Sequence, residues 1–380
     1  SDGMLCSAGE LGIDSKFLSE EQKNGLYILE GEPALGQDIR DVLDLKDAII
    51  EFELTANRPD CNSIIGIAYE AKATLDKEVT IPTLKVKEEG ANIGVDVKCE
   101  NNNLCGRYMA REITDVKIAP SPYYIQRRLI ESGIRPINNI VDITNYILHG
   151  LGQPLHAFDA DKIAMQKLKV GTLPVGTKFT TLDGVERTLN GSEIIIKDGN
   201  NSPMCIAGVL GGKDSGVSEE TTSIFLESAY FNPVAVRKAA KAHGLNTDAS
   251  FRFERGVDPN NTKTAITHAI QLITEVAGGT LVGELLENYP KKIEDFKVIL
   301  RYSKIDEILG TKIHREKIKE ILRSLEIEII NEIQNGLEIS IPAYRADVTR
   351  EIDVIEEILR IYGYNKIEAP SKISFTPVKL

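Results

Sequence analysis

A short pattern occurs twice, near the two ends of the chain. Residues 50–60 read IEFELTANRPD and residues 337–347 read LEISIPAYRAD, and four of the eleven positions are identical. Both stretches begin with alternating apolar and polar residues, a pattern typical of a half-buried strand, and continue through A-x-R-x-D into a predicted helix. The repeat predicts that a small module is duplicated and that its two copies flank a larger domain.

The length also favours several units. The chain has 380 residues, whereas an average domain has about 150, so two to four units are expected. Between residues 104 and 287 short strands alternate with helices, which predicts a large mixed domain. The predicted fold class is therefore α+β multidomain, with a large mixed α/β domain flanked by two small related helix-hairpin modules. Residues 81–103, which are rich in charge and contain Pro82, are the predicted first boundary.

Capping signals place two helices in the large domain. Asn232 is expected to cap a helix with Pro233 at its first position, and Gly244 is expected to end it. Asp258 and Pro259 repeat the same signal before the next helical pattern.

The C-terminal part follows equally local signals. Apolar residues at helical spacing predict an amphipathic helix over residues 314–325, and Asn335-Gly336 predicts a hairpin turn between two strands. A final helix is expected to end at Gly363.

Composition limits the classes of protein. With 42% hydrophobic and 27% charged residues the chain reads as an ordinary globular protein, and its net charge of −12 argues against non-specific wrapping of nucleic acid. The five cysteines lack C-x-x-C spacing, which favours reduced and mostly buried thiols over a disulfide framework or a zinc cluster. No apolar run approaches the roughly 18 residues of a spanning helix, and the first residues do not resemble a signal peptide, so a cytoplasmic location is expected.

The stretch from Arg135 to Asp159, RPINNIVDITNYILHGLGQPLHAFD, carries more short polar side chains than a packing helix needs. Its histidine, His156, follows Pro154, which fixes the local backbone. A lone loop histidine is more often structural than catalytic, so His156 needs partners to count as functional. The other four histidines, without an obvious acidic or thiol partner, are expected to be structural: His149, His243, His268 and His314.

Possible partners lie further along the chain. CIAGVLGG, residues 205–212, is a glycine-rich turn where backbone can approach a ligand closely. Glu227 interrupts the apolar strand SIFLESAYF, either as a surface residue or as a carboxylate in an apolar pocket that recognises a polar group. The segment 232–258 is locally basic and could be a solvated helix face or an edge that contacts phosphate; its cations are Arg237, Lys238, Lys241, Arg252 and Arg255.

An acidic cluster precedes and begins the last predicted helix. It consists of Asp347, Asp353, Glu356 and Glu357. Acidic residues at a helix start are stabilised by the helix dipole by about 0.3–1 kcal/mol each, which is one explanation. The other is a site for a hard cation, since converging carboxylates suit magnesium.

Four stretches of the sequence resemble the beta-subunit family of bacterial-type phenylalanyl-tRNA synthetases. They are the Arg135–Asp159 stretch, AGVLGG, FLESAYFNPVAVRKAAKAHGLNTDASFRFERGVDP and ANRPDCNSIIGIAYE. The resemblance covers essentially the whole chain. It implies the tail of a tRNA-binding oligonucleotide-binding-fold module at 1–30, a first small module at 31–90, an editing domain at 91–288, a second small module at 289–368 and the start of a linker at 369–380. The two small modules share a fold in that family, in agreement with the repeat.

The resemblance further implies hydrolysis of tyrosine misattached to phenylalanine tRNA. The implied catalytic residues are His156, which orients or deprotonates the attacking water, and Glu227, which accepts a hydrogen bond from the tyrosine hydroxyl. The implied substrate-binding residues are Arg135, Thr144, Asn145, Pro154, Gly211, Thr247 and Ala249.

For the acidic cluster the resemblance implies Mg²⁺ bound at Asp347, Asp353, Glu356 and Glu357 and shared with the alpha subunit. ATP would be used only by the full enzyme, an expected alpha2beta2 tetramer that binds tRNA(Phe). Two alternatives are a tRNA-binding and assembly scaffold without chemistry, and a metal-dependent hydrolase that uses the acidic cluster.

Overall fold

A computed structural model describes residues 4–18, 20–29, 32–43, 45–80 and 95–367. The predicted boundary at 81–103 and the predicted linker at 369–380 fall wholly or mostly outside these residues. No helix among the described residues is long and apolar enough to cross a membrane.

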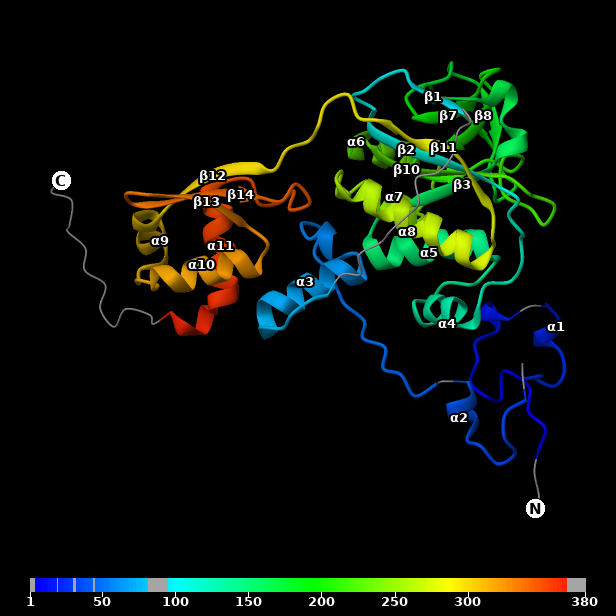
Figure 1. Ribbon diagram of the computed structural model, residues 1–380, viewed down its shortest axis with the longest axis horizontal. Helices are drawn as coiled ribbons and strands as arrows, with labels where there is room; N and C mark the ends of the chain where they lie inside the picture. Colours follow the sequence, from blue (N-terminus) through cyan, green and yellow to red (C-terminus); the bar gives the residue numbers. More distant parts are fainter. Residues whose placement is uncertain (1–3, 19, 30–31, 44, 81–94, 368–380) are drawn as a thin grey trace, which may run out of the picture.

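A four-stranded antiparallel sheet forms the centre of the large domain (Figure 1). In spatial order its strands are β11 (Thr280–Asn288), β2 (Cys105–Thr114), β10 (Ile224–Phe231) and β3 (Leu155–Asp159). Two helices, α5 (Asn139–Leu151) and α8 (Asn261–Val276), cover one face of this sheet (Figure 1).

A five-stranded sheet packs on the other face of the four-stranded sheet through a shared apolar core. Its strands, in spatial order, are β1 (Asp96–Cys99), β4 (Lys167–Gly171), β7 (Ile195–Asp198), β8 (Pro203–Ile206) and β9 (Leu210–Gly211). A small hairpin, β5 (Lys178–Thr180) with β6 (Glu186–Thr188), lies beside it. The strands predicted between residues 167 and 198 are therefore confirmed.

Alternate residues of β10 serve two different cores. Phe225 and Ala229 belong to the core between the sheets, whereas Ile224 and Leu226 belong to the core under α5 and α8. Successive side chains of a strand point to opposite faces. Glu227 therefore shares the inter-sheet face with Phe225 and Ala229.

The remaining helices of the large domain are α4 (Tyr123–Glu131), α6 (Pro233–Ala242) and α7 (Asp248–Phe253). Asn232 caps α6 by accepting from the Val234 and Ala235 N–H groups, and Gly244 follows at φ +63°, as predicted. The prediction for α8 is wrong at its start: the helix begins at Asn261, and the Asp258 side chain accepts from the Asn260 N–H before the first turn.

The C-terminal module is a three-stranded sheet with helices packed on it. Its sheet order is β12 (Phe296–Arg301), β14 (Gly336–Ile341) and β13 (Glu328–Ile333), and its helices are α9 (Tyr302–Leu309), α10 (Arg315–Ser324) and α11 (Glu351–Tyr362). The predicted amphipathic helix, hairpin and final helix are confirmed.

The N-terminal part holds α1 (Glu20–Lys23), α2 (Ile39–Val42) and α3 (Ile64–Leu75). The alternating strand predicted at the start of residues 50–60 is wrong, because residues 49–54 pair with no other described strand. An alternating sequence forms a strand only when a neighbour completes its hydrogen bonds. Figure 1 shows α3 between the large domain and the C-terminal module.

The repeated A-x-R-x-D pattern nevertheless folds alike in its two copies. Arg58 pairs with Asp60 at 2.8 Å, and Arg345 pairs with Asp347 at 3.2 Å. Helices of 12 residues follow, and the glutamate twelve positions after each arginine bonds it: Glu70 at 2.8 Å and Glu357 at 3.0 Å. The repeat is thus an ion-paired turn that fixes the start of a helix.

Candidate functional site

His156 and Glu227 face each other across two neighbouring strands. Strands β3 and β10 are antiparallel, and His156 is the direct register partner of Glu227. Residues directly opposite each other in such a pair project from the same face of the sheet. Both side chains therefore enter the space between the two sheets of the large domain.

Glu227 is a buried carboxyl group with a hydroxyl partner. Its side chain is almost entirely enclosed, with 5% of its surface exposed. The Tyr108 hydroxyl donates to Glu227 Oε2 at 2.6 Å, and among the described residues no cation pairs with it. Burial raises the pKa of Glu227 to about 8, although the Tyr108 hydrogen bond opposes this rise. Glu227 is thus not the surface residue that one interpretation of the sequence allowed.

His156 is held as a neutral imidazole. Burial lowers its pKa to about 4, and its ring packs edge-on against Phe158 with centroids 4.5 Å apart. Its Nε2 atom is buried and has no hydrogen-bond partner among the described residues. A buried polar atom without a partner is uncommon and costly, so Nε2 is available to a water molecule or a substrate.

Gly211 brings the glycine turn against the histidine. It lies in β9, and a Cβ atom built on it would come within 2.7 Å of His156 Cε1. Any larger residue would displace the imidazole. The Thr247 hydroxyl donates to the Val209 carbonyl at 2.8 Å and accepts from the Ser250 N–H at the start of α7, which ties the loop NTDAS to the glycine turn. Ala249, in the first turn of α7, is partly buried.

The other predicted binding residues lie on the segment around α5. That helix packs on the opposite face of the four-stranded sheet, and the Thr144 hydroxyl donates to the Val141 carbonyl within it. Among the described residues no hydrogen bond or ion pair holds the side chains of Arg135 and Asn145. Pro154 is buried, and its carbonyl accepts from the Gln153 side-chain amide, which also donates to the Ala229 carbonyl of β10.

Two predictions about other polar residues are corrected. His243 has an acidic partner, because its Nε2 lies 2.8 Å from Glu193 Oε1. Arg252 belongs to no exposed basic face: it is buried and donates to the Asn62 carbonyl and to Asp248. The cations of α6, at positions 237, 238 and 241, are exposed.

The acidic cluster does not fit a metal ion within this chain. Arg345 bonds both Asp347 and Glu357, and Arg360 bonds Glu357 at 2.7 Å. Asp353 accepts from the Arg350 N–H and guanidinium, while Glu356 is exposed. In the part of the chain that the structure describes, no three acidic, histidine or cysteine residues gather into a possible metal site. The arginines already neutralise most of the charge that would attract a cation.

Tyr108 is the residue of this site that sequence reasoning missed. The alternation of β2 could place it on an inward face, but only the position of β2 beside β10 sets its hydroxyl against Glu227. Cys105 and Cys205 are buried in the same core between the two sheets. The hydrogen bond with Cys99 and burial raise the pKa of Cys105, burial raises that of Cys205, and the charge of Glu227 adds a smaller contribution to both.

Two family models match the chain: a B3/4 domain over residues 104–278 and a tRNA synthetase B5 domain over residues 298–364. The phenylalanine–tRNA ligase beta subunit of Bacteroides fragilis strain YCH46 is 44% identical over 380 residues, which cover 98% of this chain and 46% of that protein. The corresponding subunit of Carboxydothermus hydrogenoformans is 42% identical over 99% of this chain and 46% of its own length. An N-terminal fragment of the phenylalanyl-tRNA synthetase beta subunit from Pyrococcus horikoshii, a solved structure, matches with a TM-score of 0.41 and 17% identity over 81% of this chain and 85% of the fragment. The chain spans about half the length of the curated relatives that it matches.

Proposed function

The chain belongs to the family of phenylalanine–tRNA ligase beta subunits, and from this premise we propose that its large domain hydrolyses tyrosine that has been wrongly attached to tRNA(Phe). The observation that carries the proposal is the direct pairing of His156 with Glu227 on adjacent strands, with both side chains on the sheet face that meets the second sheet. The proposed modules are those expected from the sequence, with the editing domain at 91–288 between small modules at 31–90 and 289–368.

Tyrosine and phenylalanine differ by one hydroxyl group, which explains the need for a second site. An apolar synthetic pocket rejects a substrate that merely adds a hydroxyl by only about 10². A site that hydrogen-bonds the hydroxyl reverses the selection. The buried Glu227 carboxyl can do so in either protonation state, because a neutral carboxyl both donates and accepts. Bound phenylalanine would leave this buried group without its substrate partner, at a cost of about 1–3 kcal/mol.

His156 is proposed to act on the attacking water. Its low pKa keeps the imidazole neutral at pH 7, so Nε2 can accept a proton from water. The water oxygen attacks the ester carbonyl, the bond to the ribose oxygen breaks, and the proton passes to that leaving oxygen. Free tyrosine and uncharged tRNA result. Gly211 leaves the imidazole room beside the reacting ester.

The remaining residues are proposed to position the substrate and the terminal adenosine. They are Arg135, Thr144, Asn145, Pro154, Thr247 and Ala249. Because Thr144 and Asn145 lie on α5, behind the four-stranded sheet, they are proposed to contact the nucleotide end of the substrate.

Synthesis of Phe-tRNA(Phe), with ATP, is proposed for the complete enzyme, with an alpha subunit as partner in an alpha2beta2 tetramer. The carboxylates of the acidic cluster do not fit Mg²⁺ in this chain, because arginines already bond Asp347, Asp353 and Glu357. Magnesium shared between the subunits stays a proposal for the assembled enzyme, in which alpha would have to release some of these carboxylates from their arginines.

Deacylation of Tyr-tRNA(Phe) by the purified chain tests the proposal. We expect His156→Ala and Glu227→Ala each to slow release of tyrosine by about 100-fold, the usual effect of removing one well-placed polar group. Gly211→Ala should slow it through the displaced imidazole. Exposed residues of the same types provide matched controls, His314→Ala and Glu219→Ala, and these should retain activity. Full activity of both His156→Ala and Glu227→Ala would contradict the assignment of the hydrolytic site. Binding of tRNA without hydrolysis by the wild-type chain would favour the alternative of a tRNA-binding scaffold without chemistry.

A further inference from the structure

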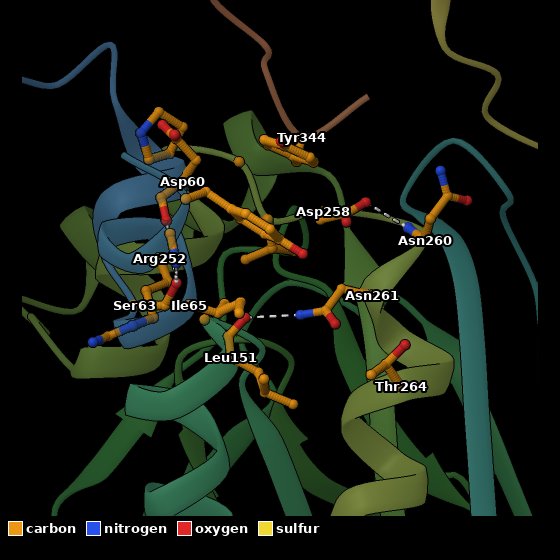
Figure 2. Close-up of a pocket in the computed structure, with 16 residues that line it drawn as sticks. Asp60, Ser63, Ile65, Leu151, Arg252, Asp258, Asn260, Asn261, Thr264 and Tyr344 are labelled. Carbon is orange, nitrogen blue, oxygen red and sulfur yellow. Dashed lines mark hydrogen bonds between the residues drawn. The ribbon is translucent and has the colours of Figure 1, made fainter. Parts of the chain in front are cut away.

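A cavity separate from the site of His156 lies where three parts of the chain meet (Figure 2). It measures about 430 Å³, within the range of about 300–1,000 Å³ typical of small-molecule sites. Its walls come from the start of α3, from the large domain between Leu151 and Thr264, and from Tyr344 of the C-terminal module.

Hydrogen bonds between distant segments hold these walls in place. Arg252 donates to the Asn62 carbonyl at 3.1 Å, which joins the large domain to the turn before α3. The Asn261 side-chain amide donates to the Leu151 carbonyl at 2.7 Å, which closes the floor between α5 and α8 (Figure 2). The cavity is thus built by specific contacts.

Two tyrosine rings give the cavity flat apolar surfaces. The rings of Tyr69 and Tyr344 are nearly parallel, at 10°, with their centroids 6.4 Å apart. They belong to different modules, and both are partly buried. Aromatic faces presented in this way are surfaces on which planar rings, including nucleobases, stack.

Among the described residues, Asp258 is a carboxylate of the cavity wall that has no ion pair. Of the charged lining residues, Asp60 pairs with Arg58 at 2.8 Å and Arg252 pairs with Asp248 at 3.2 Å. Asp258 accepts the Asn260 N–H at 2.8 Å, but no ion pair to it occurs among the described residues. Figure 2 shows Asp258 beside the cavity, below Tyr344. A partly buried carboxylate gains most from a ligand that donates N–H groups to it.

We propose that this cavity binds a nucleobase that carries an exocyclic amino group, with its ring against Tyr69 and Tyr344 and its amino group donating to Asp258. Such a base can belong to a free nucleoside or to an unpaired nucleotide of an RNA strand. The two sources share the same recognition chemistry. The proposal does not depend on the hydrolytic function, because it uses neither His156 nor Glu227.

Titration calorimetry with adenosine and with purine riboside, which lacks only the 6-amino group, tests the amino contact. The 380-residue chain should bind purine riboside about tenfold more weakly than adenosine, since a hydrogen bond to a charged group is lost. Equal affinities would overturn the proposal.

Two variants on different walls locate the binding. Asp258→Asn keeps the shape and the Asn260 contact but removes the charge, and Tyr344→Leu removes one flat face; each should weaken adenosine binding about tenfold while Asp161→Asn, an exposed matched control, should not. Unchanged binding in Asp258→Asn would overturn the proposal and assign the adenosine to another site, such as that of His156. A thermal melt of each variant checks that the fold is intact.

A short single-stranded RNA containing adenine distinguishes the two sources. If adenosine alone binds through Asp258, the ligand is a free nucleoside; if only the RNA binds and Asp258→Asn abolishes this, the ligand is a base of the strand. Absence of both interactions would overturn the proposal.

Discussion

Glu227 of the large domain and Glu357 of the C-terminal module are glutamates buried to nearly the same degree, with 5% and 6% of their surfaces exposed. Their surroundings differ. Glu227 meets the hydroxyl of Tyr108 and no cation among the described residues, and burial raises its pKa to about 8. Burial also acts on Glu357, but hydrogen bonds from Arg360 and the charge of Arg345 outweigh it and lower the pKa.

The comparison shows that burial alone does not mark a functional carboxyl group. Glu357 is saturated by two arginines, and the same arrangement recurs at Glu70, which Arg58 and Arg360 bond. Arg360 thereby links the helices α3 and α11 of the two repeated modules. A carboxyl group whose oxygen atoms are bonded by arginines helps to hold the modules together. A carboxyl group without a cationic partner can still accept a hydrogen bond from a ligand.

Removing Arg345, an arginine partner of Glu357, should cause the largest loss in the free energy of unfolding. Arg345→Met leaves Glu357 buried with only Arg360 and frees Asp347, and breaking a buried ion pair costs about 3 kcal/mol or more. Urea unfolding followed by circular dichroism would measure the loss. Arg350→Met is the matched control, since Arg350 is exposed and pairs with Asp353 at the surface; an equal loss in both variants would contradict the structural role of Arg345.

Removing the tyrosine partner should affect Glu227 less. Tyr108→Phe deletes a buried hydrogen bond worth about 1–2 kcal/mol, and because that bond lowers the pKa of Glu227, the pKa should rise further. NMR titration of the glutamate side-chain carboxyl carbon would report the shift. Tyr364→Phe, at an exposed tyrosine, should leave the titration unchanged. A Glu227 pKa that does not move would mean that Tyr108 does not orient this group.

The dependence of stability on pH should have opposite signs at the two glutamates. The folded-state pKa of Glu227 lies above its unfolded value, so its contribution is present at low pH and is lost as the pH rises toward about 8. The folded-state pKa of Glu357 is depressed, so its contribution is present above the unfolded value and is lost as the pH falls through the folded pKa.

Glutamine variants test these signs. Relative to wild type, Glu227→Gln should gain stability between pH 5 and pH 8.5, and Glu357→Gln should be most harmful near neutral pH and less so in acid. Urea midpoints from about pH 3 to about pH 8.5 provide the measurement, because the depressed pKa of Glu357 lies below the pH range in which Glu227 titrates. If the urea midpoints of the two variants changed with pH in the same direction, the predicted opposite signs at Glu227 and Glu357 would be wrong.

Local elements were predictable because their signals are local. The cap of α6 at Asn232, the hairpin turn before Gly336 and the apolar stripe of α10 depend on residues within one or two turns. Predictions that depended on a distant partner failed: residues 49–54 alternate like a strand but have no described neighbour, and His243 finds Glu193 fifty positions away. For the site, the sequence and its family resemblance singled out His156, Gly211 and Glu227, but not Tyr108.

The sequence by itself determined the repeated A-x-R-x-D turn, the amphipathic helices and the identity of the family, because these are written in short spacings and in long continuous motifs. Only the tertiary structure decided which polar groups meet. The register of β10 against β3 sets Glu227 opposite His156, and the approach of β2 gives Glu227 its hydrogen-bond partner Tyr108. Glu357 takes its arginines from its own module, Arg345 before α11 and Arg360 on α11, and the packing of α11 with α3 sets Arg360 against Glu70 as well. The pKa of a carboxyl group depends on burial and on nearby charge, and at Glu227 the burial arises from contacts between segments far apart in the chain.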